Sequence, residues 1–115
     1  MRADEVLRDV MDRWRDAVGA HRPDEVAALF TEDAIFQGLR PYGVGREVVA
    51  DYYASQPLGL AARYEVVETR ELAEGVVLGY LDVEFSFVDR PVLPVHLGVV
   101  VRDGLISHYQ VSRLD

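Results

Sequence analysis

An alternation of apolar and polar residues from Gly79 to Phe87, within the segment Val76 to Val88, is the feature that most constrains the fold of this chain. Glycine, leucine, valine and phenylalanine occupy one set of alternate positions, and tyrosine, aspartate, glutamate and serine occupy the other. Because successive side chains of a β-strand point to opposite faces of the sheet, this period of two predicts a strand with one buried face and one polar face. The chain must therefore build a sheet with a covered side.

The second half of the chain is predicted to consist of four strands joined mainly by hairpins. The sequence Arg102-Asp103-Gly104 is typical of a tight hairpin, and Glu74-Gly75 forms another turn. The predicted strands are Tyr64–Leu72, Val76–Val88, Val92–Arg102 and Leu105–Leu114.

The first half of the chain has helical periodicity instead. Between Ala3 and Ala20 the apolar residues recur at steps of three and four, which predicts an amphipathic helix. Pro23, a favoured first residue of helices, begins a second helix that ends near Thr31. The apolar positions of the first helix are Leu7, Val10, Met11, Trp14 and Val18. The later elements are a short strand at Ala34–Gln37, a loop from Gly38 to Gly45, and a third helix at Arg46–Ser55.

This order of elements predicts an α+β fold. We expect a single domain over residues 1–115, in which three N-terminal helices pack on one face of a curved, mostly antiparallel sheet. The segment Val95–Val101 is apolar on both faces and therefore needs cover on both sides. Helices cover one side, and a second copy of the sheet is the economical cover for the other. The sequence therefore predicts a homodimer through the sheet.

Composition excludes several classes of function. The formal net charge is −8, and the twelve basic residues are scattered arginines, so neither nucleic acid nor a membrane is expected as a partner. The absence of cysteine excludes thiolate metal sites, and no histidine spacing typical of a metal site occurs, so no metal or other cofactor is expected. The N-terminus has no apolar run, which favours a cytoplasmic location.

Three short motifs follow one another: Ala28-Leu29-Phe30, then Glu32-Asp33-Ala34, then Gly45-Arg46-Glu47 followed by Tyr52-Tyr53. Their order and spacing resemble the opening of nuclear-transport-factor-2-like proteins, the superfamily of ketosteroid isomerases, SnoaL-type polyketide cyclases and limonene-type epoxide hydrolases. With the four later strands the resemblance spans nearly the whole chain. It implies a cone-shaped fold whose interior is lined by the first and third helices and the sheet.

The resemblance also implies where an isomerase would carry its chemistry, and this sequence differs there. In the isomerases a tyrosine on the first helix and an acid on a later strand polarise the substrate carbonyl, while an aspartate after the first strand moves the proton. Trp14 stands at the tyrosine position, and Gln37-Gly38 stands where the base would be. The later acid would fall in the region His96–Gly98, which contains no carboxylate.

His96 is the candidate acid or base, because histidine titrates near neutral pH and the resemblance places it on the concave face beside Gly98. A hydrogen-bonded core or interface histidine fits the same pattern. Tyr53 is the second candidate catalytic residue.

An aromatic wall with a few hydrogen-bond donors is the expected lining of the pocket. Trp14 and Tyr53 would supply donors, although simple packing with satisfied polar tips explains them equally well. Tyr109 and Arg113 share one face of the last strand, which the resemblance points inward; a solvated Arg113 also fits. The predicted pocket residues are Trp14, Phe36, Tyr53, Phe85, His96, Tyr109 and Arg113.

Three hypotheses for function follow. The first is a SnoaL-like protein that binds, or also transforms, a small and mostly apolar molecule in a concave pocket without a metal. The second is a cofactor-free acid/base isomerase or polyketide cyclase using His96. The third is a non-catalytic dimeric interaction module. The aromatic lining favours the first two, and the missing isomerase carboxylates place binding ahead of catalysis.

Overall fold

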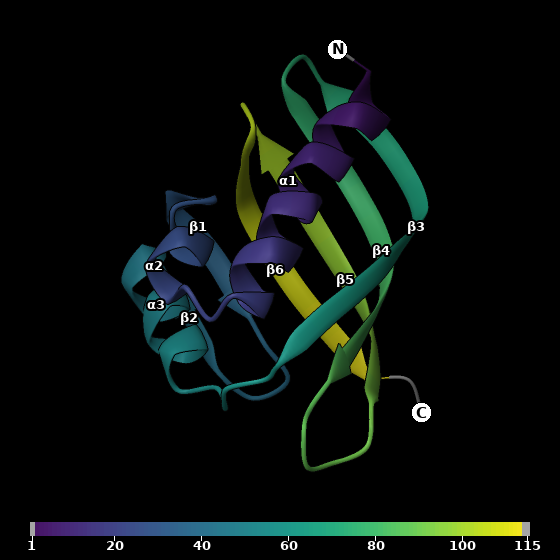
Figure 1. Ribbon diagram of the computed structural model, residues 1–115. Coiled ribbons are helices and arrows are strands. Elements are labelled where there is room, and N and C mark those ends of the chain that lie inside the picture. The colour runs from purple at the N-terminus through teal and green to yellow at the C-terminus, as the bar shows by residue number, and fades with distance from the viewer. Residues whose placement is uncertain (1, 114–115) are drawn as a thin grey trace.

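The computed structural model describes residues 2–113, which form three helices and one six-stranded sheet (Figure 1). The helices are α1 (Ala3–Gly19), α2 (Pro23–Ala27) and α3 (Arg46–Ala54). The strands are β1 (Phe30–Gln37), β2 (Tyr42–Val44), β3 (Ala61–Ala73), β4 (Val76–Ser86), β5 (Leu93–Arg102) and β6 (Leu105–Arg113). The predicted α+β class is confirmed.

The strands lie in the order β2-β1-β6-β5-β4-β3. The last four follow one another as antiparallel neighbours, as predicted, whereas β1 runs parallel to β6. This parallel pairing places Phe36 beside Tyr109, although the two are far apart in the sequence. The first and last strands thereby meet in the middle of the sheet.

Helix α1 lies across one face of the sheet, the inner face, in front of β3 to β6 (Figure 1). Residues three and four apart share one side of a helix, so the apolar stripe of α1 is buried against the strands. Gly79 lets α1 approach β4 closely, because a Cβ at this position would lie 2.6 Å from Cδ2 of Leu7. The opposite, outer face is covered by none of the helices in residues 2–113. The buried residues of α1 are Leu7, Val10, Met11, Trp14, Ala17 and Val18.

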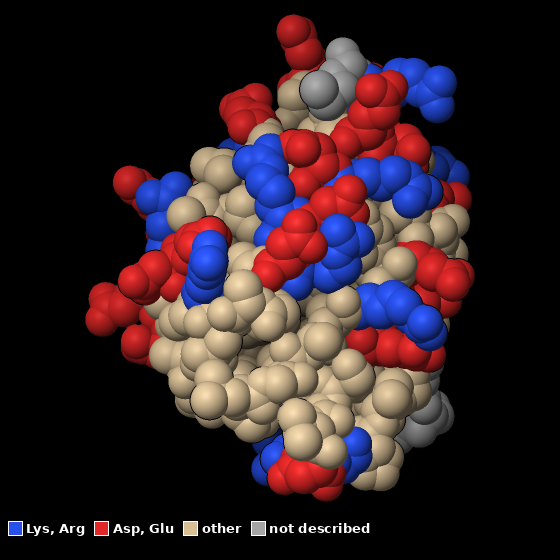
Figure 2. Space-filling model, viewed as in Figure 1, with Lys and Arg blue, Asp and Glu red and all other residues tan. Residues whose placement is uncertain are grey.

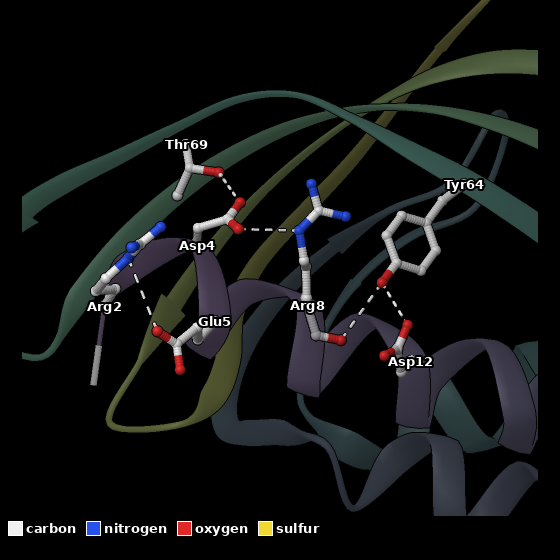
Figure 3. Close-up of polar contacts among 7 residues, drawn as sticks. All are labelled: Arg2, Asp4, Glu5, Arg8, Asp12, Tyr64 and Thr69. Atoms are coloured by element: carbon white, nitrogen blue, oxygen red, sulfur yellow. Dashed lines mark hydrogen bonds and ion pairs between the residues drawn. The ribbon is translucent and has the colours of Figure 1, made fainter.

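Polar contacts fix α1 along the edge strand β3 (Figure 3). The hydroxyl of Tyr64 lies within hydrogen-bond distance of the Asp12 carboxylate and 3.4 Å from the backbone carbonyl of Arg8. One helical turn before Arg8, the carboxylate of Asp4 accepts a hydrogen bond from Thr69 Oγ1 over 3.5 Å. The helix is therefore held to the sheet by these polar contacts with β3 as well as by its buried apolar stripe.

The structure corrects the predicted connection between the second and third helices. Helix α2 ends at Ala27, and Phe30 already begins β1, so the second helix does not reach Thr31. The expected loop from Gly38 to Gly45 contains the short strand β2, which pairs antiparallel with β1. Gly43 permits this pairing beside α3, because a Cβ there would lie 2.5 Å from Cγ1 of Val48. Leu114, the predicted end of the last strand, lies outside the described residues.

Substitution of Gly79 by alanine is expected to destabilise the fold by about 1–3 kcal/mol, because the added methyl group overlaps Leu7 and pushes α1 from β4. Gly19→Ala is the matched control, since a Cβ at this exposed helix-end position meets nothing within 4 Å. Urea unfolding of the two variants measures the difference. Equal midpoints would contradict a close approach of α1 at Gly79.

Candidate functional site

An aromatic cluster fills the space between the helices and the inner face of the sheet. We call it the inner aromatic cluster. Its six residues come from five elements, and all except the partly buried Phe85 are at most 4% exposed. Phe36 stacks on Tyr109 with ring centroids 4.9 Å apart, and Phe85 lies edge-on to Trp14 at 6.1 Å. The cluster consists of Trp14 (α1), Phe30 and Phe36 (β1), Tyr53 (α3), Phe85 (β4) and Tyr109 (β6).

A chain of hydrogen bonds crosses this cluster. Trp14 Nε1–H donates to the Tyr53 hydroxyl over 3.2 Å, and the hydroxyls of Tyr53 and Tyr109 lie 3.2 Å apart. The three side chains carry three polar hydrogens, one on each, but make two hydrogen bonds among themselves. Every buried polar side-chain atom of the described residues takes part in at least one hydrogen bond. One of the two tyrosine hydroxyls nevertheless keeps a hydrogen that has no acceptor among the described residues.

The phenols of Tyr53 and Tyr109 are neutral hydrogen-bond donors. Burial raises the pKa of the Tyr109 phenol, and the neighbouring Tyr53 adds to this effect. Burial also raises the pKa of Tyr53, which the hydrogen bonds from Tyr109 and Trp14 only partly offset. At physiological pH the pair can donate a hydrogen bond, but neither phenol is a base.

The inner face is filled by side chains. The cavity that touches Tyr53 has a volume of about 10 Å³, room for roughly one water molecule. Large aromatic rings occupy the place of the expected concave pocket, because six of them converge there from five elements. A ligand on this side would have to displace one of these rings.

The structure corrects the expected orientation of His96. The residue does share a face with Gly98, but that face is the outer one, because Val95, Leu97 and Val99 take the inner positions of β5. His96 Nδ1 lies 2.8 Å from Oδ1 of Asp82, its cross-strand neighbour, and the His96 side chain is 58% exposed. The two candidate catalytic residues, His96 and Tyr53, therefore lie on opposite faces of the sheet.

Arg113 ends β6 and is exposed. The register of β6 on β5 places it opposite Val95, on the same strand face as Tyr109. Of the seven predicted pocket residues, Trp14, Phe36, Tyr53, Phe85 and Tyr109 meet in one cluster, while His96 and Arg113 lie outside it. Sequence analysis missed Phe30, whose ring contacts Tyr109 at 5.8 Å, because its position was assigned to a helix.

The outer face carries a concavity of about 600 Å³, which we call the outer concavity. Its floor is formed by β4, β5 and β6, and the Asp82–His96 pair lies on its wall. Within residues 2–113, no three His, Asp or Glu side chains lie close enough together to hold a metal ion. The lining residues include Val67, Leu78, Tyr80, Asp82, His96, Gly98, His108, Gln110 and Ser112.

Comparisons with solved structures identify the fold. An NTF-2-like protein of unknown function from Shewanella oneidensis superposes with a TM-score of 0.82 and 12% identity, covering 96% of this chain and 99% of that one. A ketosteroid-isomerase-like protein from Erwinia carotovora gives 0.77 and 19% identity, covering 96% and 95%. The chain has the nuclear-transport-factor-2-like fold. The orange carotenoid protein of Anabaena, solved with canthaxanthin, contains the same fold in 36% of its chain, at a TM-score of 0.78, 16% identity and 91% coverage of this chain.

Other comparisons add no closer relationship to this NTF2-like fold. No protein-family model matches the sequence, and no curated protein matches it. No helix in residues 2–113 is long and apolar enough to cross a membrane.

Tyr53 and Tyr109 are expected to ionise only when the protein unfolds. Because their pKa values are raised above the ordinary value of about 10, the folded state keeps protons that the unfolded state releases above that pH. Their contribution to folding stability is therefore constant below that pH and decreases as pH rises further. In an alkaline titration, tyrosinate absorbance should show a late step, at a pH above that at which exposed tyrosines ionise. This late step should coincide with the loss of circular dichroism.

The variants Tyr53→Phe and Tyr109→Phe should each remove one phenol from this late step. Full ionisation of all tyrosines with unchanged circular dichroism would contradict the burial of the pair.

Proposed function

We propose that this NTF2-like chain binds a small, mostly apolar molecule with a hydrogen-bond acceptor, such as a carbonyl oxygen, on the inner face. The observation that carries the proposal is the buried hydroxyl hydrogen without an acceptor in the Trp14–Tyr53–Tyr109 chain. A buried donor that lacks an acceptor costs about 1–3 kcal/mol. An acceptor brought by a ligand would remove this cost.

Tyr109 is the residue that would donate to the ligand. Tryptophan only donates, so the Tyr53 oxygen already accepts the hydrogen of Trp14. If Tyr53 then donates to Tyr109, the Tyr53 hydroxyl both accepts and donates, and its two bonds strengthen one another. This direction leaves the hydrogen of Tyr109 free for the ligand.

Phe85 is the ring that a ligand would displace. It is partly exposed, unlike the rest of the cluster. Its ring contacts the indole of Trp14, and the same indole lies 6.2 Å from the ring of Tyr109, so Phe85 and Tyr109 have Trp14 as a common neighbour. Between α1 and the segment that follows β4, the inner side has an uncharged surface (Figure 2). A ligand in place of Phe85 would therefore lie between apolar walls and against Trp14.

Binding is favoured over chemistry at this site. The cluster contains phenols and an indole but no carboxylate or histidine that could move a proton, because His96 lies on the outer face. The solved carotenoid complex and the ketosteroid-isomerase-like structure share the fold, and the first of them binds canthaxanthin. A cytoplasmic location, expected from the sequence, remains part of the proposal.

The test uses a naphthyl ketone whose fluorescence reports the polarity around it. Phe85→Ala removes the displaced ring and should bind the ketone more tightly than the unmodified chain does. Adding Tyr109→Phe to this variant should weaken binding about tenfold, the value of one hydrogen bond. Adding Tyr42→Phe instead, which removes an exposed hydroxyl, should change nothing. Binding that is indifferent to both Phe85 and Tyr109 would refute the proposal.

A further inference from the structure

Two loops lie side by side at the end of the molecule where β3 begins and β4 ends (Figure 1). They are the α3–β3 loop, residues 55–60, and the β4–β5 loop, residues 87–92. The sheet pairs Ala61 with Ser86, which brings the two loops together. Val88 then lies directly against Gly59, because a Cβ on this glycine would lie 2.3 Å from Cγ2 of Val88. The two loops therefore form one continuous surface, which we call the loop end.

The loop end exposes apolar side chains that the core does not use. Val88 is 83% exposed, Leu58 is 75% exposed and Val92 is 50% exposed. The exposed Pro57 and Pro91 stand next to them in the two loops. Single apolar residues scattered over a surface are normal, but here they converge from two loops that are distant in the sequence. Such a concentration is typical of an interaction site.

The loop end carries no net charge, although the chain as a whole has a net charge of −8. The two loops contain one acid and one base, Asp89 and Arg90. Nε of Arg90 lies 3.4 Å from Oδ1 of Asp89, and its guanidinium lies 4.8 Å from the centroid of the Phe87 ring. Charged side chains gather instead over α1 (Figure 2). The loop end is therefore an uncharged, apolar part of an otherwise acidic surface.

We propose that the loop end docks on the surface of a lipid bilayer with uncharged or zwitterionic headgroups, into which Leu58, Val88 and Val92 insert. The net charge of −8 disfavours an anionic lipid surface, so the proposed lipid carries no net charge. A long arginine side chain can keep its charged end among the headgroups while its stem lies in apolar surroundings, which suits Arg90. Docking of this kind is peripheral and needs no membrane-spanning helix.

A folded protein partner would require a different surface. Standard interfaces engage about 20–30 residues on each side, and their binding energy comes mainly from buried Trp, Tyr and Arg anchors. The loop end consists of two six-residue loops whose strongly exposed large side chains are one leucine and two valines. Binding to a lipid surface scales with the apolar area that inserts, so a few projecting aliphatic side chains are enough for weak, reversible docking.

The loop end lies beside Phe85, the ring that a ligand of the inner face would displace. Phe85 is paired with Ala62 near the start of β3 and with Leu93, which directly follows the β4–β5 loop. Because a mostly apolar molecule partitions into lipid, docking would bring this entrance to a source of the ligand. This link rests on the proposed function, whereas docking itself does not, and vesicles that contain no ligand test docking alone.

Flotation with phosphatidylcholine vesicles tests the proposal. A single acyl chain binds lipid with a constant of about 10⁴ M⁻¹, and a comparable insertion should float most of the unmodified chain at about 1 mM lipid. Leu58→Glu and Val88→Glu should each weaken binding at least about tenfold, because a charge replaces an inserted aliphatic group. Val67→Glu and Leu72→Glu are the matched controls, since these β3 residues are 62% and 56% exposed but lie outside the loop end. Both controls should bind as the unmodified chain does.

A fluorescent label measures insertion without adding a charge. The chain contains no cysteine, so one introduced thiol can carry a polarity-sensitive dye. A dye on Val88→Cys should shift its emission to shorter wavelength when phosphatidylcholine vesicles are added, whereas a dye on Leu72→Cys should not. This measurement keeps the test decisive if the glutamate variants lose their circular dichroism.

Four results would overturn the proposal. The first is an unmodified chain that does not float with phosphatidylcholine vesicles at about 5 mM lipid. The second is binding that requires phosphatidylserine, and the third is binding that Leu58→Glu and Val67→Glu weaken equally. The fourth is a sedimenting mass that Leu58→Glu lowers in the absence of lipid, because the loop end would then be a contact between protein chains.

Discussion

The pairing register of β4, β5 and β6 is the constraint on which both faces of this molecule depend. In this register Leu81, Leu97 and Val111 lie side by side on the inner face, and the residues between them point outward. A slip of one residue would exchange the faces of a strand, bringing Tyr109 into solvent or His96 under α1. Each buried valine or leucine contributes about 1.5–3 kcal/mol, so exposing one strand's inner residues would use up most of a typical stability of 5–15 kcal/mol. The chemistry of each face is therefore fixed together with the register.

The hydroxyl of Tyr109 determines which residue of the core carries the hydrogen that lacks an acceptor. A phenylalanine at this position would make the same stacking contact with Phe36, but Tyr53, which accepts from Trp14, would lose the acceptor for its own hydrogen. The Tyr109 hydroxyl supplies that acceptor in a hydrogen bond worth about 1 kcal/mol, and the hydrogen without an acceptor is then the one on Tyr109. One buried hydrogen lacks an acceptor in either case, so folding gains only this one bond, whereas an acceptor brought by a ligand would remove the remaining cost. This arrangement supports a ligand on the inner face even though aromatic rings fill the space.

Local periodicity made much of the fold predictable, and its limits explain the errors. The stripe of α1 and the alternation of β4 each indicate a buried side without knowledge of any partner. Strand β2 has only three residues and exists through its pairing with β1, so no local pattern reveals it. In β5 both faces are apolar, and its sequence alone does not say which face is buried. The register does: His96 lies opposite Asp82, and the alternation of β4 already assigned Asp82 to the polar side.

The ligand site proposed on the inner face and the homodimer contact predicted for the face without helices share strands but do not compete for space. Tyr109 points to the inner face, while its neighbours His108 and Gln110 line the outer concavity. A second copy on the outer face would thus cover β6 from behind and hold the strand that carries the donor. Phe85, where a ligand would enter, is paired with Leu93 near the end of the β4–β5 ladder, beyond the row that contains Asp82 and His96. The entrance therefore lies away from the middle of the outer face, so one chain could pair with a second copy and take up a ligand at the same time.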